Sequence, residues 1–487
     1  MFLSKSDYII GLDCLKQLWL KKNRKDLEPE YDDRTLQNFE TGNKVQDLAR
    51  DYYPGGVLVD AETWDVFGGA AKTKEAVKSH DILYEATAVL DNGCFCRIDV
   101  LVKNGTAWDL IEIKSAAKVQ NYYIDDLAFQ KYVFENAGYP VINCKVLYIN
   151  NKYVRHGELD IRQLFTEEDV SERVNAKKNE VEGFVKGMLS YQEMPEEPEI
   201  PPHSGCTDCP YYTYCCKDVP EYSVFDLLSS KKADLFYNQT KSFNVEDVSE
   251  DWCTSDTQLI DRAAYLNKDL HVEPENIQEW LNTLEYPLYY LDYETVQCAI
   301  PMFDGARPYE QIPFQFSLHI QETPGAELKH VEFLHQERSD PRRAIAEALI
   351  KGCGKHGSIV VYNKAFEMTR NKELAKLFPD LAPDLLAINE RVVDQLLPFK
   401  NRALYSYTQN GSASIKHVLP AFSDLSYKGM NIANGGVAMS KYLAFLEGKQ
   451  TDEENMQMFA DLLKYCGQDT YAMVLLMDVL YKFAKGE

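Results

Sequence analysis

The sequence predicts an α/β protein with two domains that a helical connector joins. In the first part of the chain, short apolar runs with strand-like alternation are separated by Asn-Gly turns and precede a helical pattern. A buried-strand pattern begins again near residue 288, and a long amphipathic pattern runs toward the C-terminus. A Pro/Glu-rich stretch at 194–202 separates the two patterns and is typical of a linker. A length of 487 residues fits two or three domains.

The first predicted domain, residues 1–220, contains three strands that form consecutive hairpins. Gly93 and Gly105 complete the turns Asp-Asn-Gly and Lys-Asn-Gly, which favour tight chain reversals. The helix that follows is predicted to end at Gly138. The predicted elements are strands at 81–89, 94–103 and 106–115, a helix at 125–137 and a strand at 141–150.

The second predicted domain, residues 286–487, follows a polar and mostly helical connector at 221–285. Proline at 341, after Ser-Asp, begins one helix. Thr451 and Glu454 form a capping box that begins the long last helix. The predicted strands of this domain are 288–292, 313–321, 330–334 and 358–362.

Composition restricts the class of protein. The formal net charge of −24 argues against a protein that coats nucleic acid non-specifically, because such a protein needs a basic face. The charge is compatible with an enzyme whose acidic site binds divalent cations. No apolar run reaches the roughly 18 residues of a membrane helix, and the first residues lack the pattern of a signal peptide. We therefore expect a cytoplasmic protein without membrane contact. In that reducing compartment, twelve cysteines favour metal ligation over structural disulfides.

The first candidate site combines two carboxylates and a lysine on neighbouring predicted strands. Glu112 and Lys114 are two residues apart and therefore project from the same face of their strand. If this strand pairs with the preceding one, Asp99 lies beside Glu112, and the oxygens form a hard site for Mg²⁺ or Mn²⁺. Lys114 then orients an attacking water or stabilises charge on a phosphate. The alternative is three charged residues on the solvated face of a sheet.

Three cysteines form a C-x2-C-x5-C pattern at the end of the first domain. Cys206, Cys209 and Cys215 need a fourth ligand to close a soft-metal site, and Cys14 is the candidate. Structural zinc, an iron–sulfur cluster and cysteines that merely pack are all compatible with this spacing. A single site containing Cys14 requires the two ends of the first domain to meet.

The second candidate site consists of acidic residues in the second domain. Asp292 and Glu294 share one face at the end of an apolar strand, and Glu367 follows the predicted strand 358–362. Asp469 lies on the apolar face of the last helix by its 3.6-residue spacing. An isolated buried carboxylate is costly, so Asp469 should be protonated, paired or metal-bound. The alternative is a hydrogen-bonded aspartate in the core.

Residues 1–220 resemble the RecB-family nucleases of the PD-(D/E)xK superfamily. The likeness is strongest to members with an iron–sulfur staple, such as the CRISPR-associated RecB-like exonuclease and the C-terminal nuclease of AddB. The resemblance implies a 4Fe–4S cluster that ties the ends of the domain together, with Zn²⁺ as the alternative. The family often has a metal-binding His where this chain has Gln46. Because Cys216 follows Cys215 directly, the position of the last cysteine ligand is open by one residue. The counterparts of the family motifs are Cys14, Asp99, Glu112, Lys114, Gln130, Cys206, Cys209 and Cys215.

Residues 286–485 resemble the DnaQ-like, RNase H-fold exonucleases of the DEDD group, and in particular a family of uncharacterised domains fused to RecB-like nucleases. Asp292, Glu294, Glu367 and Asp469 match the four acidic positions. Glu367 departs from the usual Asp. Tyr465 stands four residues before the last acid, where such enzymes place a residue that orients water. The implied fold is a mixed sheet flanked by helices.

Together these patterns and resemblances imply a metal-dependent nuclease that hydrolyses phosphodiester bonds, DNA being the expected substrate, with two active sites. In the first site Asp99 and Glu112 hold the ion and Lys114 assists the attacking water. In the second site the four acids hold two ions that flank the scissile phosphate. The alternative from another functional class is a nucleic-acid-binding or scaffold protein whose second domain keeps the fold but not the chemistry.

Overall fold

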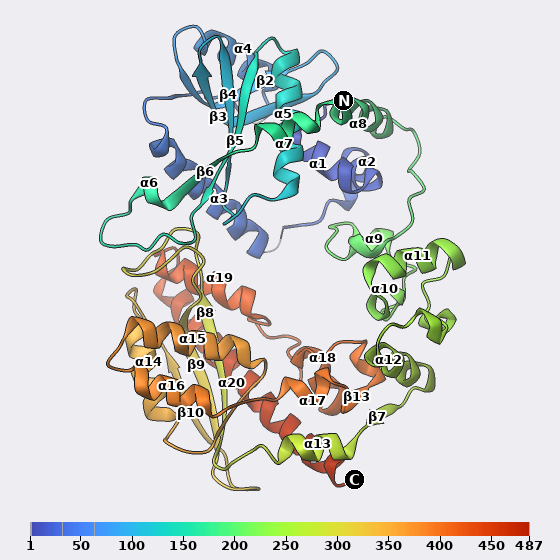
Figure 1. Cartoon of the computed structure of the whole chain (residues 1–487), viewed down its shortest axis with the longest axis vertical. Coiled ribbons are helices and arrows are strands. Elements are labelled where there is room, and N and C mark those ends of the chain that lie inside the picture. Colours follow the sequence, from blue (N-terminus) through green and yellow to red (C-terminus); the bar gives the residue numbers. More distant parts are fainter. Residues whose placement is uncertain (1, 32, 63, 487) are drawn as a thin grey trace. The chain divides into compact units, whose positions relative to one another are not determined.

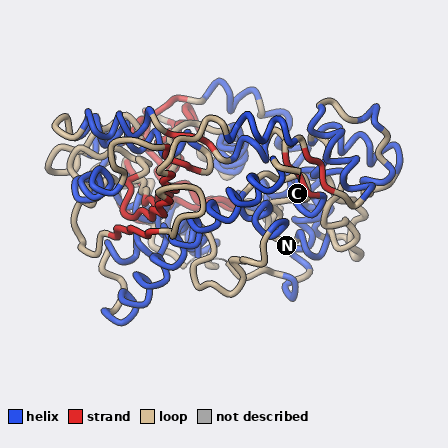
Figure 2. The backbone as a smooth tube through the Cα atoms, turned by 90° about the horizontal axis from the view of Figure 1, so that it is seen from below, coloured by secondary structure: helices blue, strands red, loops and turns tan. Residues whose placement is uncertain are grey.

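The computed structural model describes residues 2–31, 33–62 and 64–486 and contains two compact units, each with its own sheet and helices (Figure 1). The first unit consists of Met1–Pro201 and Cys298–Tyr309, and the second of Pro202–Gln297 and Glu310–Glu487. The predicted α/β class is confirmed, because both units contain sheets and helices. Figure 2 distinguishes the helices from the strands by colour. The predicted connector belongs entirely to the second unit.

The first unit is built on a six-stranded sheet in the order β1-β2-β3-β4-β5-β6. The pairs β2–β3 and β3–β4 are antiparallel hairpins, as predicted, and Gly93 and Gly105 adopt positive φ angles in their turns. The pair β4–β5 is parallel, with helix α5 as the crossover. Strand β6 extends the sheet beyond the predicted elements. The strands are β1 (Val57–Leu58), β2 (Ile82–Val89), β3 (Phe95–Asn104), β4 (Ala107–Lys114), β5 (Val141–Ile149) and β6 (Phe165–Asp169).

Two apolar layers hold this sheet. On one face, side chains such as Leu110 and Phe129 pack between the sheet and helices α1, α5 and α8. On the other face, Val45 of α3 packs against Ile111 and Leu147. The helices are α1 (Lys5–Asp13), α2 (Leu15–Asn23), α3 (Asp33–Tyr52), α4 (Val66–Ala76), α5 (Asn121–Asn136), α6 (Ile161–Leu164), α7 (Ser171–Ala176) and α8 (Lys178–Gln192), with the 3-10 turn η1 (Lys25–Leu27).

The second unit is built on a mixed five-stranded sheet in the order β10-β9-β8-β11-β12, and a two-stranded sheet pairs β13 with β7. Strands β8, β9 and β10 are antiparallel, whereas β11 pairs in parallel with β8 and β12. The central strand β8 is therefore flanked on both sides and buried along most of its length. The strands are β7 (Leu270–Val272), β8 (Leu288–Val296), β9 (Ile312–Gln321), β10 (Lys329–Leu334), β11 (Ser358–Val361), β12 (Val392–Asp394) and β13 (Leu404–Ser406).

Helices pack against this sheet, with α14, α15 and α16 in one layer and α19 and α20 in contact with β8 and β9 (Figure 1). The capping box of Thr451 and Glu454 is present at the start of α20. The helices are α9 (Tyr212–Cys215), α10 (Val224–Leu227), α11 (Ser230–Thr240), α12 (Asp256–Asn267), α13 (Pro274–Leu281), α14 (Arg342–Gly352), α15 (Lys364–Leu377), α16 (Ala382–Glu390), α17 (Leu396–Lys400), α18 (Ile415–Phe422), α19 (Gly435–Leu446) and α20 (Asp452–Ala484), with the 3-10 turns η2 (Ser204–Cys206), η3 (Val245–Asp247), η4 (Glu250–Trp252) and η5 (Tyr407–Gln409).

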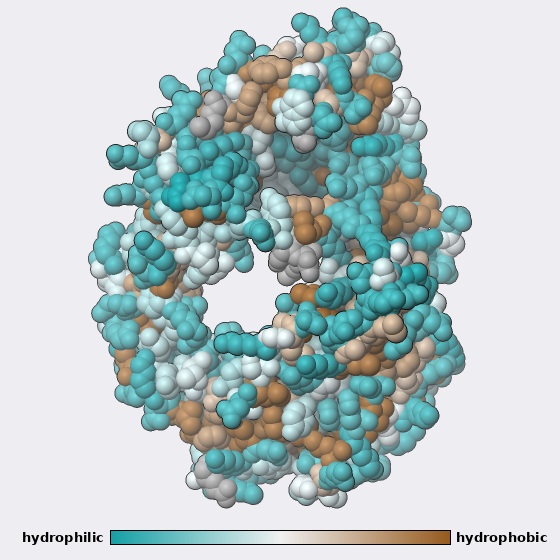
Figure 3. All heavy atoms as spheres, turned by 180° about the vertical axis from the view of Figure 1, so that it is seen from behind, coloured by the Kyte–Doolittle hydropathy of each residue, from teal (hydrophilic) through white to brown (hydrophobic). Residues whose placement is uncertain are grey.

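Within the described residues, no helix combines the length and the apolar character that a membrane crossing requires. Figure 3 shows hydrophilic side chains over much of the drawn face, with smaller hydrophobic patches between them.

Candidate functional site

The first group of polar side chains lies on β3 and β4 in the first unit. Val100 of β3 pairs with Ile111 of β4, which places Asp99 and Glu112 next to each other at the following position. The carboxylate of Asp99 accepts a hydrogen bond from the backbone N–H of Ile113 at 2.7 Å. The sheet register, rather than any flexible contact, therefore fixes the separation of the two carboxylates.

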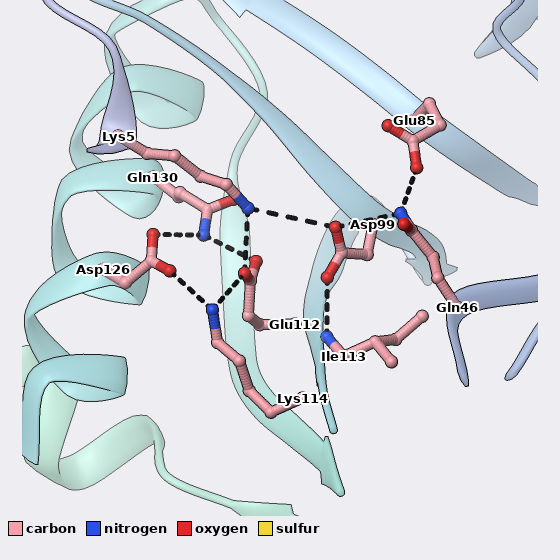
Figure 4. A network of polar contacts seen from close by, with 9 residues as sticks. All are labelled: Lys5, Gln46, Glu85, Asp99, Glu112, Ile113, Lys114, Asp126 and Gln130. Atoms are coloured by element: carbon pink, nitrogen blue, oxygen red, sulfur yellow. Dashed lines mark hydrogen bonds and ion pairs between the residues drawn. The ribbon is translucent and has the colours of Figure 1, made fainter. Parts of the chain in front are cut away.

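Helix α5 supplies the partners of the ExK pair (Figure 4). Lys114 Nζ lies 2.8 Å from Glu112 Oε1 and 3.0 Å from Asp126 Oδ2. The amide of Gln130 donates to Glu112 Oε2 at 2.8 Å and to Asp126 Oδ1 at 2.9 Å. Asp126 and Gln130 are one helical turn apart, so α5 presents both to the strand. Gln130 and Lys114, which the sequence assigns to one site with Glu112, both contact Glu112 directly.

Two charged residues that no local pattern singles out complete this group. Lys5, the first residue of α1, lies with Nζ 2.8 Å from Glu112 Oε1 and 3.9 Å from Asp99 Oδ1. Glu85 of β2 lies across from Asp99 in the sheet and has a φ of +59°. A non-glycine residue in this left-handed region is strained, and such strain concentrates at functional sites. The side-chain amide of Gln46 hydrogen-bonds to both carboxylates, at 3.3 Å from Asp99 Oδ1.

The charges in this group act strongly on one another. Burial and the negative charge of Glu112 raise the pKa of Asp99. Burial opposes ionisation of Glu112 as well, but the cations Lys114 and Lys5 hold its pKa far below the usual value. Burial also works against a charged Lys114, yet Glu112 and Asp126 raise its pKa above the usual value. Lys114 is therefore an ammonium ion at neutral pH, while Asp99 readily holds a proton that a divalent cation would replace.

The second group lies in the second unit, where β8 meets α20. Asp292, Glu294 and Asp469 each offer a carboxylate oxygen, and these oxygens lie within 4.8 Å of one another. Among the described residues, this is the one set of three or more His, Cys, Asp or Glu side chains with that geometry. Asp292 and Glu294 come from the same face of β8, and Asp469 comes from the buried side of α20, as their spacing indicates.

Tyrosine hydroxyls orient the carboxylate that α20 contributes. Tyr427 donates to Asp469 Oδ1 at 2.5 Å, and Tyr465, one turn before Asp469 on α20, also hydrogen-bonds to this carboxylate. Lys416 Nζ lies 5.7 and 5.8 Å from the centres of the Tyr427 and Tyr465 rings, and its charge attracts Glu294 and Asp469. The carboxylates thus have one nearby cation but form no ion pair within the described part of the chain.

Glu367, the fourth predicted acid, lies on α15 and is buried. Its Oε2 atom has no hydrogen-bond partner among the described residues, and burial raises its pKa to about 8. Its negative charge acts on Asp292, although it does not belong to the set of three oxygens within 4.8 Å. Asp394 fixes the start of α15 by accepting hydrogen bonds from the backbone N–H groups of Asn363 and Lys364 at 3.0 and 3.1 Å.

The second group is chemically suited to divalent cations. Burial raises the pKa of Asp292, Glu294, Asp469 and Glu367, and mutual repulsion with Asp469, Glu294 and Glu367 raises that of Asp292 further. Carboxylate oxygens are the ligands that Mg²⁺ and Mn²⁺ prefer, and the buried Oε2 atom of Glu367 has no hydrogen-bond partner among the described residues. The residues present therefore fit a site for hard cations.

The pKa shifts predict that the metal-free chain loses stability as the pH rises. Burial raises the pKa of both Glu294 and Glu367 to about 8, so the folded state keeps protons that the unfolded chain has already released. This stabilisation is complete below about pH 4 and is lost as the pH rises through about 8. We expect the melting temperature in EDTA to fall between about pH 5.5 and pH 8.5, and Glu367→Gln to flatten this dependence. A melting temperature that rises over the same range contradicts the expectation.

The predicted cysteine ligands lie in different units. Cys14 is in the first unit, where its side chain caps α2 by accepting from the backbone N–H of Gln17 at 3.4 Å. Cys206, Cys209 and Cys215 are in the second unit, between the start of η2 and the end of α9. No disulfide links any of the twelve cysteines, all of which are described. The four-cysteine cluster stays a prediction.

Parts of the sequence resemble known proteins. A family described as a domain of unknown function (DUF2779) matches residues 289–414, which include Asp292, Glu294 and Glu367. An uncharacterised protein of Mycoplasma pneumoniae is 29% identical over 208 residues, or 38% of this chain and 31% of that protein. An uncharacterised protein of Mycoplasma genitalium is 28% identical over 219 residues, or 40% of this chain and 32% of that protein. An uncharacterised protein of Ureaplasma parvum is 26% identical over 210 residues, or 38% of this chain and 30% of that protein. The matched part of the chain thus spans about a third of the length of these relatives, to which it is similar.

Proposed function

We propose that the chain is a metal-dependent nuclease that hydrolyses phosphodiester bonds in DNA. The observation that carries the proposal is the position of Asp99 beside Glu112, with Lys114 and Gln130 bonded to Glu112. Three hairpin-linked strands and a crossover helix that holds Gln130 also support a PD-(D/E)xK core. The mixed sheet with α15 and α20 supports an RNase H-like second unit.

The residues of the first group have distinct roles in this proposal. Asp99 and Glu112 would hold a divalent cation, which supplies an activated water and neutralises charge on the phosphate. Gln130 orients Glu112 and Asp126 through two hydrogen bonds. Because Glu112 and Asp126 keep Lys114 protonated, Lys114 acts as a cation that orients water and stabilises negative charge on the phosphate, not as a base.

The second group is proposed as a separate nuclease centre. Asp292, Glu294 and Asp469 would hold cations there, and Glu367 is close enough for its charge to act on Asp292. The hydrogen bonds from Tyr427 and Tyr465 fix the rotamer of Asp469. Two ions flanking a scissile phosphate would stabilise both the attacking and the leaving oxygen.

One observation favours a different function for the second unit. Glu367 lies outside the set of three oxygens that approach one another within 4.8 Å. If its longer side chain does not complete the site, this unit binds nucleic acid or serves as a scaffold without hydrolysing it. The two functions are separated by incubating the full chain with Mn²⁺ and end-labelled single-stranded and double-stranded DNA and RNA. If Lys114→Ala abolishes all hydrolysis, the activity belongs to the first unit, and the second unit does not hydrolyse nucleic acid.

We propose a 4Fe–4S cluster with Cys14, Cys206, Cys209 and Cys215 as its ligands, on the spacing of these cysteines in the sequence. Protein purified without oxygen is then expected to be brown and to contain iron and sulfide in comparable amounts, because four thiolates stabilise such a cluster. Cys209→Ser should lose the iron, whereas Cys253→Ser, outside the motif, should keep it. Colourless protein with one zinc ion contradicts the iron–sulfur assignment but keeps a metal site, and protein without either metal contradicts both.

A further inference from the structure

Lys5, the first residue of α1, contacts the carboxylates of the first group. Its Nζ lies 2.8 Å from Glu112 Oε1, the same oxygen that Lys114 contacts at 2.8 Å, and 3.9 Å from Asp99 Oδ1 (Figure 4). One ammonium group thus bridges the two carboxylates that the proposed function assigns to the divalent cation.

The backbone holds Lys5 in this position. Leu3 pairs with the start of β3 through two backbone hydrogen bonds of 3.0 Å. The N–H of Leu3 donates to the carbonyl of Gly93, and the carbonyl of Leu3 accepts from the N–H of Phe95. Ser4 then caps α1 in a capping box with Asp7, so α1 begins at Lys5. Because Asp99 lies on the same strand as Phe95, the pairing of Leu3 fixes the start of α1 relative to the carboxylates. The contact is therefore built into the fold and does not depend on the side chain alone.

An ion between Asp99 and Glu112 would take the position that the Lys5 ammonium group occupies, because that group contacts both carboxylates. A Mg²⁺ or Mn²⁺ ion binds carboxylate oxygens at about 2.1 Å, which places it against an ammonium nitrogen bonded to the same oxygen. Like charges at such a separation repel strongly in a partly buried site. Lys5 must release Glu112 Oε1 when the cation binds, while Lys114 keeps Asp126 as a second partner.

The released ammonium group has an evident use. The four carboxylates of the site outnumber its two lysines, and a phosphodiester brings a further negative charge. The Lys5 side chain is 29% exposed, so part of it is open to solvent. A lysine ammonium is a common point-charge ligand for phosphate. The residues that carry the six charges are Lys5, Glu85, Asp99, Glu112, Lys114 and Asp126.

We propose that Lys5 holds the place of the divalent cation between Asp99 and Glu112 until that cation binds, and then binds the phosphate of the nucleic-acid strand. This inference rests on the proposed nuclease function and adds a substrate-binding residue to it. In the absence of the ion, Lys5 neutralises the carboxylates and weakens ion binding by competition. In its presence, Lys5 contributes one phosphate contact.

The test measures binding without hydrolysis, in full-length chains that carry Asp292→Asn so that the first site dominates ion binding. Lys5→Met is expected to tighten Mn²⁺ binding, measured by the electron paramagnetic resonance of free Mn²⁺, by about tenfold because a competing charge is removed. Binding of a labelled DNA oligonucleotide in Ca²⁺ should weaken, with a salt slope reduced by about one phosphate contact. Lys5→Arg should restore DNA binding, and Lys25→Met, an exposed lysine on η1, should change neither quantity.

The outcomes separate this inference from the proposed function. Mn²⁺ binding that is unchanged or weaker in Lys5→Met overturns the competition between Lys5 and the ion. Unchanged DNA binding overturns the phosphate contact, even if Mn²⁺ binds more tightly. Both measurements report on Lys5 whether or not the chain cleaves DNA, so a chain that binds Mn²⁺ and DNA as expected but hydrolyses nothing contradicts the proposed function alone.

Discussion

Replacing Lys114 by alanine is expected to lower Mn²⁺-dependent DNA hydrolysis by at least about a hundredfold, the usual cost of removing one group that stabilises transition-state charge. The ammonium of Lys114 is held between Glu112 and Asp126 and stays protonated. Lys5 also contacts Glu112 Oε1, but Lys114 is the lysine that contacts Asp126 as well, so the variant loses the cation at that position. Initial rates with end-labelled DNA measure the effect. The full chain with Asp292→Asn serves as the reference, so that the second group does not contribute.

A lysine on the neighbouring strand provides the matched control. Lys103 lies near the end of β3, pairs with Asp81 at 3.2 Å and is largely exposed. Lys103→Ala removes one positive charge from the same sheet without touching Glu112, and it should leave the rate within about twofold because exposed pairs of this kind contribute little. Equal rates for Lys114→Ala and Lys103→Ala would show that the ExK pair is structural.

The second large effect is expected on stability. Mn²⁺ should raise the melting temperature of the full chain because it relieves repulsion among Asp292, Glu294 and Asp469. A ligand that binds only the folded state at 100 times its dissociation constant stabilises it by about 2.7 kcal/mol. Asp292→Asn is expected to remove most of the Mn²⁺-dependent shift, measured by calorimetry in Mn²⁺ and in EDTA. The same variant should melt higher than the unmodified chain in EDTA, since one of the repelling charges is gone.

Asp478→Asn is the control for this measurement. Asp478 lies further along α20 and is exposed, outside the set of three carboxylates. Its replacement should leave the Mn²⁺ shift intact. If Mn²⁺ does not stabilise the unmodified chain, Asp292, Glu294 and Asp469 do not form an ion site, and nucleic-acid binding without hydrolysis becomes the function of the second unit.

Local sequence patterns predict much of the fold. The two hairpins of the first unit follow from Gly93 and Gly105, because glycine adopts the positive φ that each turn requires. The start of α20 follows from the side chains of Thr451 and Glu454, which satisfy the first backbone N–H groups of the helix. Such signals involve residues within a few positions of one another and do not depend on tertiary structure. The short strands β6, β12 and β13 have no such signal, because only pairing with a neighbour makes them strands.

The candidate sites are predictable where their residues share an element, where a hairpin joins two strands, or where periodicity places an acid on the apolar face of a helix. Glu112 and Lys114 lie two apart on one strand, and the hairpin brings Asp99 beside them. Lys5 and Glu85 cannot be identified in this way. Lys5 reaches Glu112 only through the pairing of Leu3 with β3, and the position of Glu85 depends on a left-handed backbone that its own sequence does not favour.

The most direct test of the nuclease assignment is an endpoint digestion of labelled DNA by four full-length proteins purified without oxygen: the unmodified chain, Lys114→Ala, Asp292→Asn and the double variant. With Mn²⁺ present, we expect the unmodified chain to release short products, Asp292→Asn to remain active, and the double variant to release none. EDTA should abolish all hydrolysis. A double variant that digests DNA as fast as the unmodified chain, or an unmodified chain that leaves DNA and RNA intact with Mn²⁺, would contradict the assignment.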